Sequence, residues 1–254
     1  MRPKLATTRA YIIPKAVSKL KDAEKSSQFD ILELFPGKTE ETVGPEVAAF
    51  FNKITKDYTP LTPLLNPPVD PIIVEEYEVT AALKGFKKPR SLVRCNIFPD
   101  LSTLYADILA IPLTRIFNEG FRLGIWPEIW REETAVIIPK CRQPENLSDL
   151  RNLSCTPLYS KVMESFVLAR IKSETKIRPS QYGGIKGCGT THYLWDLWNE
   201  VLEGLEDKNS AMALMSIDFS KAFNSIAHLP YIQSHKDHGA SSGTVAAVHG
   251  FLCQ

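Results

Sequence analysis

An apolar run in the C-terminal third of the chain ends on a single carboxylate. The run begins at Ala213, the carboxylate is that of Asp218, and Phe223 follows five residues later. A charged side chain is costly inside an apolar sheet unless a cation lies opposite it. We therefore expect a strand that ends at a site, with Asp218 as a metal ligand and an aromatic ring beside it. In the alternative interpretation, Asp218 is the N-cap of a helix that begins at Phe219.

Two cations precede this segment in a pattern that suits phosphate binding. Lys140 follows a short β-prone run over residues 134–138, and Arg151 comes after a polar loop. A lysine point charge and a forked guanidinium on one hairpin-like arm could together hold a phosphate chain. Two solvated surface cations are the alternative.

A glycine-rich segment from Gln181 to Thr191 leads into an apolar helical pattern. Glycines such as Gly183 let a backbone approach a ligand closely, and exposed amides at a helix start attract phosphate. The segment lacks the Gly-Lys-Ser/Thr ending of a nucleotide P-loop. From its composition we predict a loop whose helix N-cap is Thr190 or Thr191.

The elements that must position these residues follow from apolar spacing and turn residues. Two short strands, over 134–138 and in the run before Asp218, alternate with amphipathic helices, which predicts a mixed α+β fold. Pro112 should interrupt or kink one helix, and Gly120 or Gly124 should end it. The expected helices begin at Pro45 and at Thr156-Pro157 or cover residues 79–86, 101–117 and 194–205.

Composition restricts the class of protein. The chain has 254 residues, 44% of them apolar, and a net charge of +1, so any nucleic-acid surface must be local. Five cysteines without a C-x-x-C pair argue against a disulfide framework and a zinc ribbon, and favour reduced thiols in the nucleus or cytoplasm. No signal sequence or long apolar span indicates a membrane.

Residues 1 to about 40 suggest a weakly ordered leader, and five prolines between Pro60 and Pro71 suggest a linker.

Six segments, in their order and with their gaps, resemble the reverse transcriptase domain of non-LTR (LINE-type) retrotransposons. The likeness runs from about Val74 to the last residue. It implies the fingers and the first part of the palm of a right-hand polymerase in residues 74–254, after a leader and proline-rich linker in residues 1–73. The segments are Trp126–Trp130, Ala135–Lys140, Asp149–Ser154, Ser160–Glu164, Ser180–Gly183 and Asp218–Phe223.

The resemblance also implies roles for single residues. Asp218 falls on the first metal-binding aspartate, assisted by the carbonyl of Phe219, and Phe223 falls on the aromatic residue that excludes a ribose 2′-hydroxyl. The cations that hold the incoming triphosphate correspond to Lys140 and Arg151. The segment along the template corresponds to Gln181 and Gly183. The implied reaction adds deoxynucleotides from dNTPs to a DNA primer on an RNA template by phosphoryl transfer with two Mg²⁺ ions.

Departures from the family pattern suggest an incomplete site. The sequence ends at Gln254 before the Pro-Gln-Gly turn and the Tyr-Ala-Asp-Asp hairpin, and Asn224 replaces a second aspartate. One carboxylate cannot hold two ions. We therefore expect a truncated retroelement product with an incomplete Mg²⁺ site, inactive alone, and an exposed apolar edge over residues 211–217.

Two other classes of function stay open. The first is a non-catalytic nucleic-acid-binding remnant that uses a basic face. The second is a small metal site of histidines, although surface histidines are the usual outcome. The basic face would consist of Lys140, Arg142, Arg151, Lys161, Arg170, Lys172 and Lys186. The histidines are His228, His235, His238 and His249.

Overall fold

The computed structural model describes residues 30–52, 61–86, 99–132, 134–206, 211–219 and 222–253. Helices dominate this part of the chain, and its two strands form one antiparallel hairpin, so the predicted mixture of helices with a small sheet is confirmed. In chain order the elements are η2 (Ile31–Leu34), α1 (Glu40–Asn52), α2 (Glu76–Lys84), α3 (Pro99–Leu104), α4 (Ala106–Leu123), α5 (Glu128–Arg131), β1 (Thr134–Pro139), η4 (Leu147–Asp149), β2 (Leu150–Cys155), α6 (Leu158–Glu174), α7 (Thr190–Gly204), α8 (Ala222–Ser225), α9 (His228–Asp237) and α10 (Ser242–Leu252).

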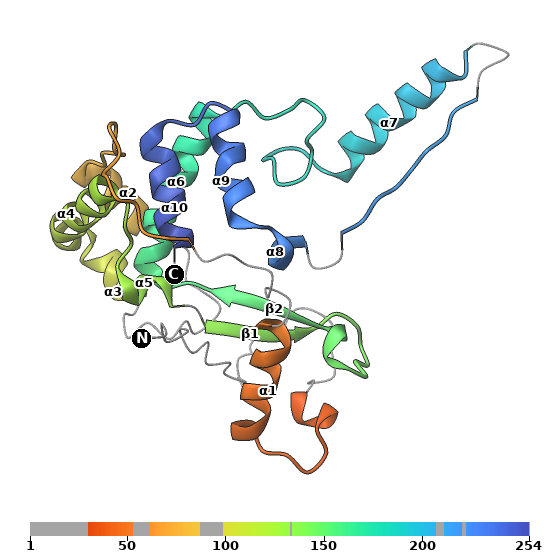
Figure 1. The fold of residues 1–254 in the computed structure, drawn as a ribbon, viewed down its shortest axis with the longest axis horizontal. Helices are drawn as coiled ribbons and strands as arrows, with labels where there is room; N and C mark the ends of the chain where they lie inside the picture. Colours follow the sequence, from red (N-terminus) through yellow and green to blue (C-terminus); the bar gives the residue numbers. More distant parts are fainter. Residues whose placement is uncertain are drawn as a thin grey trace.

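The main hydrophobic core lies among α2, α4, α6, α9 and α10, which gather at one end of the molecule (Figure 1). Phe117 and Phe121 of α4 are buried there, against residues such as Met163 of α6. Gly124 ends α4 in the left-handed conformation at φ +65°, as predicted. Pro112, however, does not break the helix. The break falls at Tyr105, and α4 continues because its buried face outweighs the single hydrogen bond that a proline removes.

The proline-rich segment over residues 61–75 has no helix or strand, as its prolines predict. It is nevertheless packed, because Leu61, Ile72 and Val74 are buried in the main core. The Asn118 side chain of α4 accepts a hydrogen bond from the amide of Val74 at 2.8 Å and donates one to its carbonyl at 2.9 Å. This segment is therefore part of the packed body, while the domain boundary at residue 73 stays a prediction.

A second, smaller core joins the N-terminal helices to the hairpin. Ile31, Val43, Val47 and Leu150 are buried in it, and α1 lies beside the hairpin (Figure 1). The expected leader thus already contains packed structure from Ile31 onward. Helix α1 begins at Glu40, before the predicted start, so Pro45 lies inside it rather than in its first turn.

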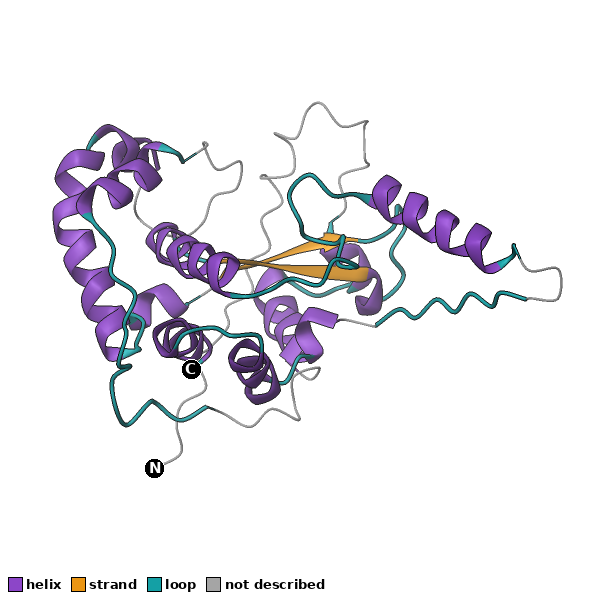
Figure 2. Cartoon of the chain, turned by 90° about the horizontal axis from the view of Figure 1, so that it is seen from above, coloured by secondary structure: helices purple, strands orange, loops and turns teal. Residues whose placement is uncertain are grey.

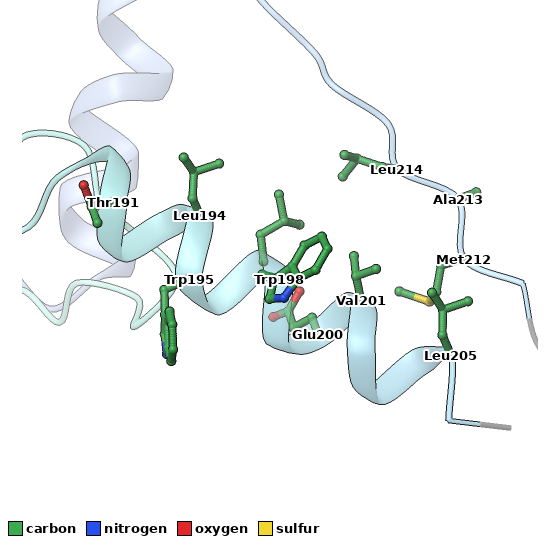
Figure 3. Close-up of a pocket in the computed structure, with 11 residues that line it drawn as sticks. Thr191, Leu194, Trp195, Trp198, Glu200, Val201, Leu205, Met212, Ala213 and Leu214 are labelled. Atoms are coloured by element: carbon green, nitrogen blue, oxygen red, sulfur yellow. The ribbon is translucent and has the colours of Figure 1, made fainter.

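Helix α7 and the segment 211–219 project away from the other helices, as two perpendicular views show (Figures 1 and 2). Residues 211–219 are all exposed and form no strand, so the strand predicted before Asp218 is wrong. No strand that the structure describes pairs with it, and helix α7, which lies beside residues 212–214 (Figure 3), cannot supply the ladder of hydrogen bonds that defines a strand. Among the helices described, none has the length and apolar character needed to cross a bilayer.

Candidate functional site

The hairpin brings Lys140 near Arg151. Ile138 pairs with Arg151 across β1 and β2, and the amide of Lys140 extends the ladder by donating to the carbonyl of Asp149 at 2.8 Å. Lys140 directly follows β1, two residues beyond the partner of Arg151, so the register brings the two residues near each other along the chain of the hairpin. Both side chains are exposed. Their joint binding of a phosphate chain stays a prediction.

The loop between these cations is held by its own hydrogen bonds. The carboxylate of Asp149 accepts from the amides of Glu145 at 3.0 Å and Asn146 at 3.3 Å, and Asn146 accepts from the amide of Ser148 at 2.9 Å. The Lys140 ammonium donates to the carbonyl of Ser148 at 2.7 Å, which fixes it over the loop. Sequence reasoning missed this support, although an Asn followed three residues later by Asp is the pattern of a capping box.

The glycine-rich segment packs on the first turns of α7. The Tyr182 hydroxyl donates to the Asp196 carboxylate, and its ring meets that of Tyr193 edge-on at 5.7 Å. The hydrogen bond to Asp196 is the main cause that raises the pKa of Tyr182 to about 12. Sequence reasoning also missed this pair.

The residues expected to lie along a template are at the surface of that segment. Gln181 and Gly183 are both exposed, and the Gln181 amide donates to the carbonyl of Gly183 at 2.8 Å. The N-cap of α7 is Gly189, not Thr190 or Thr191, and Nδ1 of His192 accepts a hydrogen bond from its amide at 3.2 Å. The roles of Gln181 and Gly183 stay predictions.

The structure does not assemble the ion pocket expected at Asp218. The Asp218 side chain is exposed in the segment 211–219, and the Phe219 side chain is 75% exposed. No ion pair in the described part of the chain joins Asp218 to Lys140 or Arg151, and no cluster of three or more potential metal ligands occurs among the described residues. Phe223 belongs to α8, but its side chain lies outside the described residues.

The wider basic face is partly neutralised. Arg170 forms an ion pair with Glu174 at 3.3 Å, while Arg142, Lys161 and Lys186 are exposed. At the hairpin, Arg142 follows Lys140 by two residues.

The histidines lie on α9 and α10. Burial first, and then repulsion by a neighbouring cation, lowers the pKa values of His228, His235 and His249. His238 is the C-cap of α9, its Nδ1 lies 2.7 Å from the backbone carbonyl of Ser234, and it is close enough to His235 to act on the pKa of that residue, so their shared helix face stays a prediction. The described histidines thus form no three-ligand cluster.

Comparison with known proteins supports the resemblance found in the sequence. Residues 138–252 match a family described as reverse transcriptase (RNA-dependent DNA polymerase). The RNA-directed DNA polymerase from the mobile element jockey of Drosophila funebris is 29% identical over 171 residues, which are 63% of this chain and 18% of that protein. Its counterpart in Drosophila melanogaster is 31% identical over 121 residues, 46% of this chain and 13% of that protein.

A third relative comes from another element. The retrovirus-related Pol polyprotein from the type-1 retrotransposable element R2 of Popillia japonica is 23% identical over 181 residues, 69% of this chain and 24% of that protein. The chain therefore spans less than a quarter of the length of each of these relatives. The matches confirm the resemblance to the reverse transcriptase domain of non-LTR retrotransposons.

Proposed function

We propose that this chain, which carries part of a reverse transcriptase domain of the non-LTR type, contributes the fingers and the first part of the palm to a right-hand polymerase. The matched residues 138–252 support this proposal, as do the helices and the antiparallel hairpin that carry them. The activity of that polymerase is RNA-directed DNA synthesis, with an RNA template, a DNA primer and dNTPs as partners, and we expect this chain alone to be inactive. An intracellular location, in the nucleus or cytoplasm, is part of the proposal and rests on the odd number of cysteines.

The observation that carries the proposal is the pairing of β1 with β2, which brings Lys140 near Arg151 in the sequence register of the hairpin. An arginine fork presents parallel donors to phosphate oxygens, and a lysine adds a compact charge. Asp149 and Asn146 already hold the loop between these cations. Binding of a triphosphate therefore costs little conformational entropy. We assign these two cations to the triphosphate of the incoming dNTP.

The roles proposed for the remaining site residues follow from where these residues stand in the sequence. Gln181 and Gly183, exposed before α7, are assigned to the template strand. Phe223 is assigned to exclusion of the ribose 2′-hydroxyl, and the carbonyl of Phe219 to the metal side of the site. These assignments rest on the order of the segments along the chain.

Asp218 is the proposed ligand for Mg²⁺, since an exposed carboxylate is a hard oxygen donor of the type that this ion prefers. The described residues do not by themselves fit a complete magnesium site, because no further carboxylate joins Asp218 in a cluster of three. The role proposed for Asp218 is therefore limited to binding one ion, and a second ion would need carboxylates beyond the described residues.

Binding of a dNTP tests the proposal. We expect Lys140→Ala and Arg151→Ala each to weaken dNTP binding by about tenfold or more, because each removes a charge-assisted hydrogen bond. Arg151→Lys should not restore the affinity, since lysine lacks the fork. Arg115→Ala, an exposed cation on α4, is the matched control and should bind like the unchanged chain. Equal affinity of all four variants would refute the assignment.

A non-catalytic nucleic-acid-binding role is the second candidate, favoured by the exposed cations Arg142, Lys161 and Lys186. In that case, binding of a single-stranded RNA should fall steeply with salt and should not change in Asp218→Ala. Weakening by Lys140→Ala that is the same for RNA and for dNTP would favour this role over a triphosphate site.

A further inference from the structure

Residues 30–52, which comprise η2 and α1 and which we name the N-terminal unit, pack against the hairpin although they lie far from it in the sequence (Figure 1). The buried members of the second core are Ile31, Phe35, Val43 and Val47 of the N-terminal unit and Leu150 of β2. Since all the other buried members belong to that unit, Leu150 joins the core through contacts with it.

The second core reaches the hairpin next to both cations of the proposed triphosphate site. Leu150 directly precedes Arg151 in β2. Leu147, which begins η4 in the loop, also packs against this core, and the next residue is Ser148. The carbonyl of Ser148 accepts the hydrogen bond from the Lys140 ammonium at 2.7 Å. Each cation is therefore linked, within one residue, to a side chain of the second core.

Strand geometry places the N-terminal unit behind Arg151. Successive side chains of a strand point to opposite faces. Leu150 is 1% exposed, whereas Arg151 is exposed. Ile137, which also packs against the second core, pairs with Asn152 and so shares the face of Leu150. The N-terminal unit thus covers one face of the hairpin and leaves the Arg151 side chain accessible on the other.

The N-terminal unit is held together by its own polar contacts. Lys38 forms an ion pair with Glu46 of α1, and its ammonium lies 5.1 Å from the centre of the Phe35 ring. Asp30 caps η2 by accepting a hydrogen bond from the amide of Leu32 at 2.9 Å. A two-stranded hairpin by itself is only marginally stable in water. The N-terminal unit therefore offers a formed surface to a hairpin that needs packing.

We propose that the N-terminal unit positions the triphosphate site: through Leu150 it keeps residues 140–151 ordered, so that Lys140 and Arg151 are in place before a nucleotide binds. This inference rests on the proposed function and adds to it an element that lies outside the matched residues 138–252. Leu150 is a positioning residue, since it acts through its neighbours. If only about one molecule in ten had the loop in place, the apparent affinity for the nucleotide would fall about tenfold.

Nucleotide binding by core variants tests the proposal. Val47→Ala removes two methyl groups from the N-terminal unit without touching either cation, and it should raise the Kd for a dNTP about tenfold. Val79→Ala removes the same atoms from the main core, where Val79 is 0% exposed as against 1% for Val47. This matched control should bind the dNTP like the unchanged chain, because the two cores share no residue.

Conservative replacement separates positioning from general loss of structure. Leu150→Ala should weaken dNTP binding like Val47→Ala, whereas Leu150→Met keeps the volume and should bind like the unchanged chain. Leu147→Ala, at a partly buried position, is the milder variant and should also weaken binding. Circular dichroism checks the fold of each variant.

Hydrogen exchange reports the order of the loop without any nucleotide. The amides of Glu145, Asn146 and Ser148 donate hydrogen bonds within the loop. These amides should exchange at least several-fold faster in Val47→Ala than in the unchanged chain, and at an unchanged rate in Val79→Ala.

Three results would overturn the proposal: loop exchange that stays the same in Val47→Ala, dNTP affinity that stays the same in that variant, or an equal loss of affinity in Val79→Ala. Absence of dNTP binding by the unchanged chain would refute the triphosphate assignment. The exchange rates would then decide by themselves whether the N-terminal unit orders the loop.

Discussion

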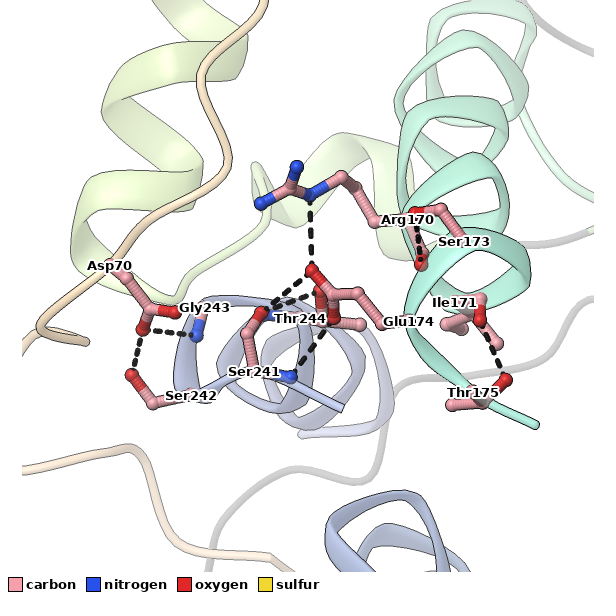
Figure 4. Close-up of polar contacts among 10 residues, drawn as sticks. All are labelled: Asp70, Arg170, Ile171, Ser173, Glu174, Thr175, Ser241, Ser242, Gly243 and Thr244. Carbon is pink, nitrogen blue, oxygen red and sulfur yellow. Dashed lines mark hydrogen bonds and ion pairs between the residues drawn. The ribbon is translucent and has the colours of Figure 1, made fainter. Parts of the chain in front are cut away.

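Glu174, in the last turn of α6, accepts hydrogen bonds from both the amide and the hydroxyl of Ser241, the N-cap of α10, at 2.9 Å and 3.0 Å (Figure 4). On the other side of the same helix start, the carboxylate of Asp70 accepts from the amide of Gly243 at 3.0 Å and from the Ser242 hydroxyl. The first amides of a helix have no partner within it and attract negative charge. Two carboxylates from distant parts of the chain therefore hold α10 in the core.

Removal of the first of these carboxylates should destabilise the protein. We expect Glu174→Ala to lower the free energy of unfolding by about 1–3 kcal/mol, because it leaves the Ser241 amide without its partner in a part-buried position. Urea unfolding measures this value. Glu203→Ala, an exposed glutamate on α7, is the control and should unfold like the unchanged chain.

The contact between Glu174 and Ser241 should also make the stability of the protein depend on pH. Burial by itself would raise the pKa of Glu174, but hydrogen bonds from Ser241 and Thr244 and the charge of Arg170 lower it below its ordinary value of 4.5. The stabilisation is therefore present above that value and is lost as pH falls through the folded pKa. Glu174→Ala should be less sensitive than the unchanged chain to acidification over this range, and an identical loss in both would contradict the assignment.

Two glycines in α10 let its backbone lie closer to neighbouring backbone than a residue with a Cβ atom could. A Cβ atom on Gly243 would lie 1.9 Å from the carbonyl oxygen of Asp70, and one on Gly250 would lie 2.3 Å from that of Gly124. Because backbone must move in both cases, Gly243→Ala and Gly250→Ala should each lower the thermal unfolding midpoint, at a cost of about 1–3 kcal/mol. A Cβ on Gly183 would meet only the Gln181 side chain, at an ordinary 3.7 Å, so Gly183→Ala is the control. A midpoint that stays unchanged in Gly243→Ala would show that α10 does not pack as described.

The helices α9 and α10 should lose stability in mild acid. Burial and the proximity of His249 lower the pKa of His228, and burial and the proximity of Lys236 lower that of His249. A histidine whose pKa is lowered in the folded state takes up a proton more readily in the unfolded state. Its contribution to stability is therefore present above the unfolded pKa of about 6.5 and is lost as pH falls from there through the folded pKa. Thermal unfolding at about pH 7.5 and about pH 5.5 should show a lower midpoint at the acid pH. His249→Gln should reduce that difference.

Local chemistry explains the elements that could be predicted. Gly124 ends α4 because glycine alone reaches the left-handed conformation without strain, and the β-prone run after Thr134 forms β1 because a polar loop lets it fold back on itself. Pro112 does not interrupt α4, since the effect of a proline depends on how much apolar surface the rest of the helix buries, while a kink there stays a prediction. For the same reason, the proline-rich segment could be predicted as irregular but not as packed.

The sequence by itself determined the family resemblance, the order of the segments that carry it and the candidate residues, because these depend on residue types and their spacing. Only the tertiary structure decided that Ile138 pairs with Arg151 in the hairpin, that Asp218 stands in an exposed segment, and that Glu174 and Asp70 hold α10. Strand pairing and long-range hydrogen bonds join residues far apart in the chain, and the partner that each one finds depends on the packing of everything between them.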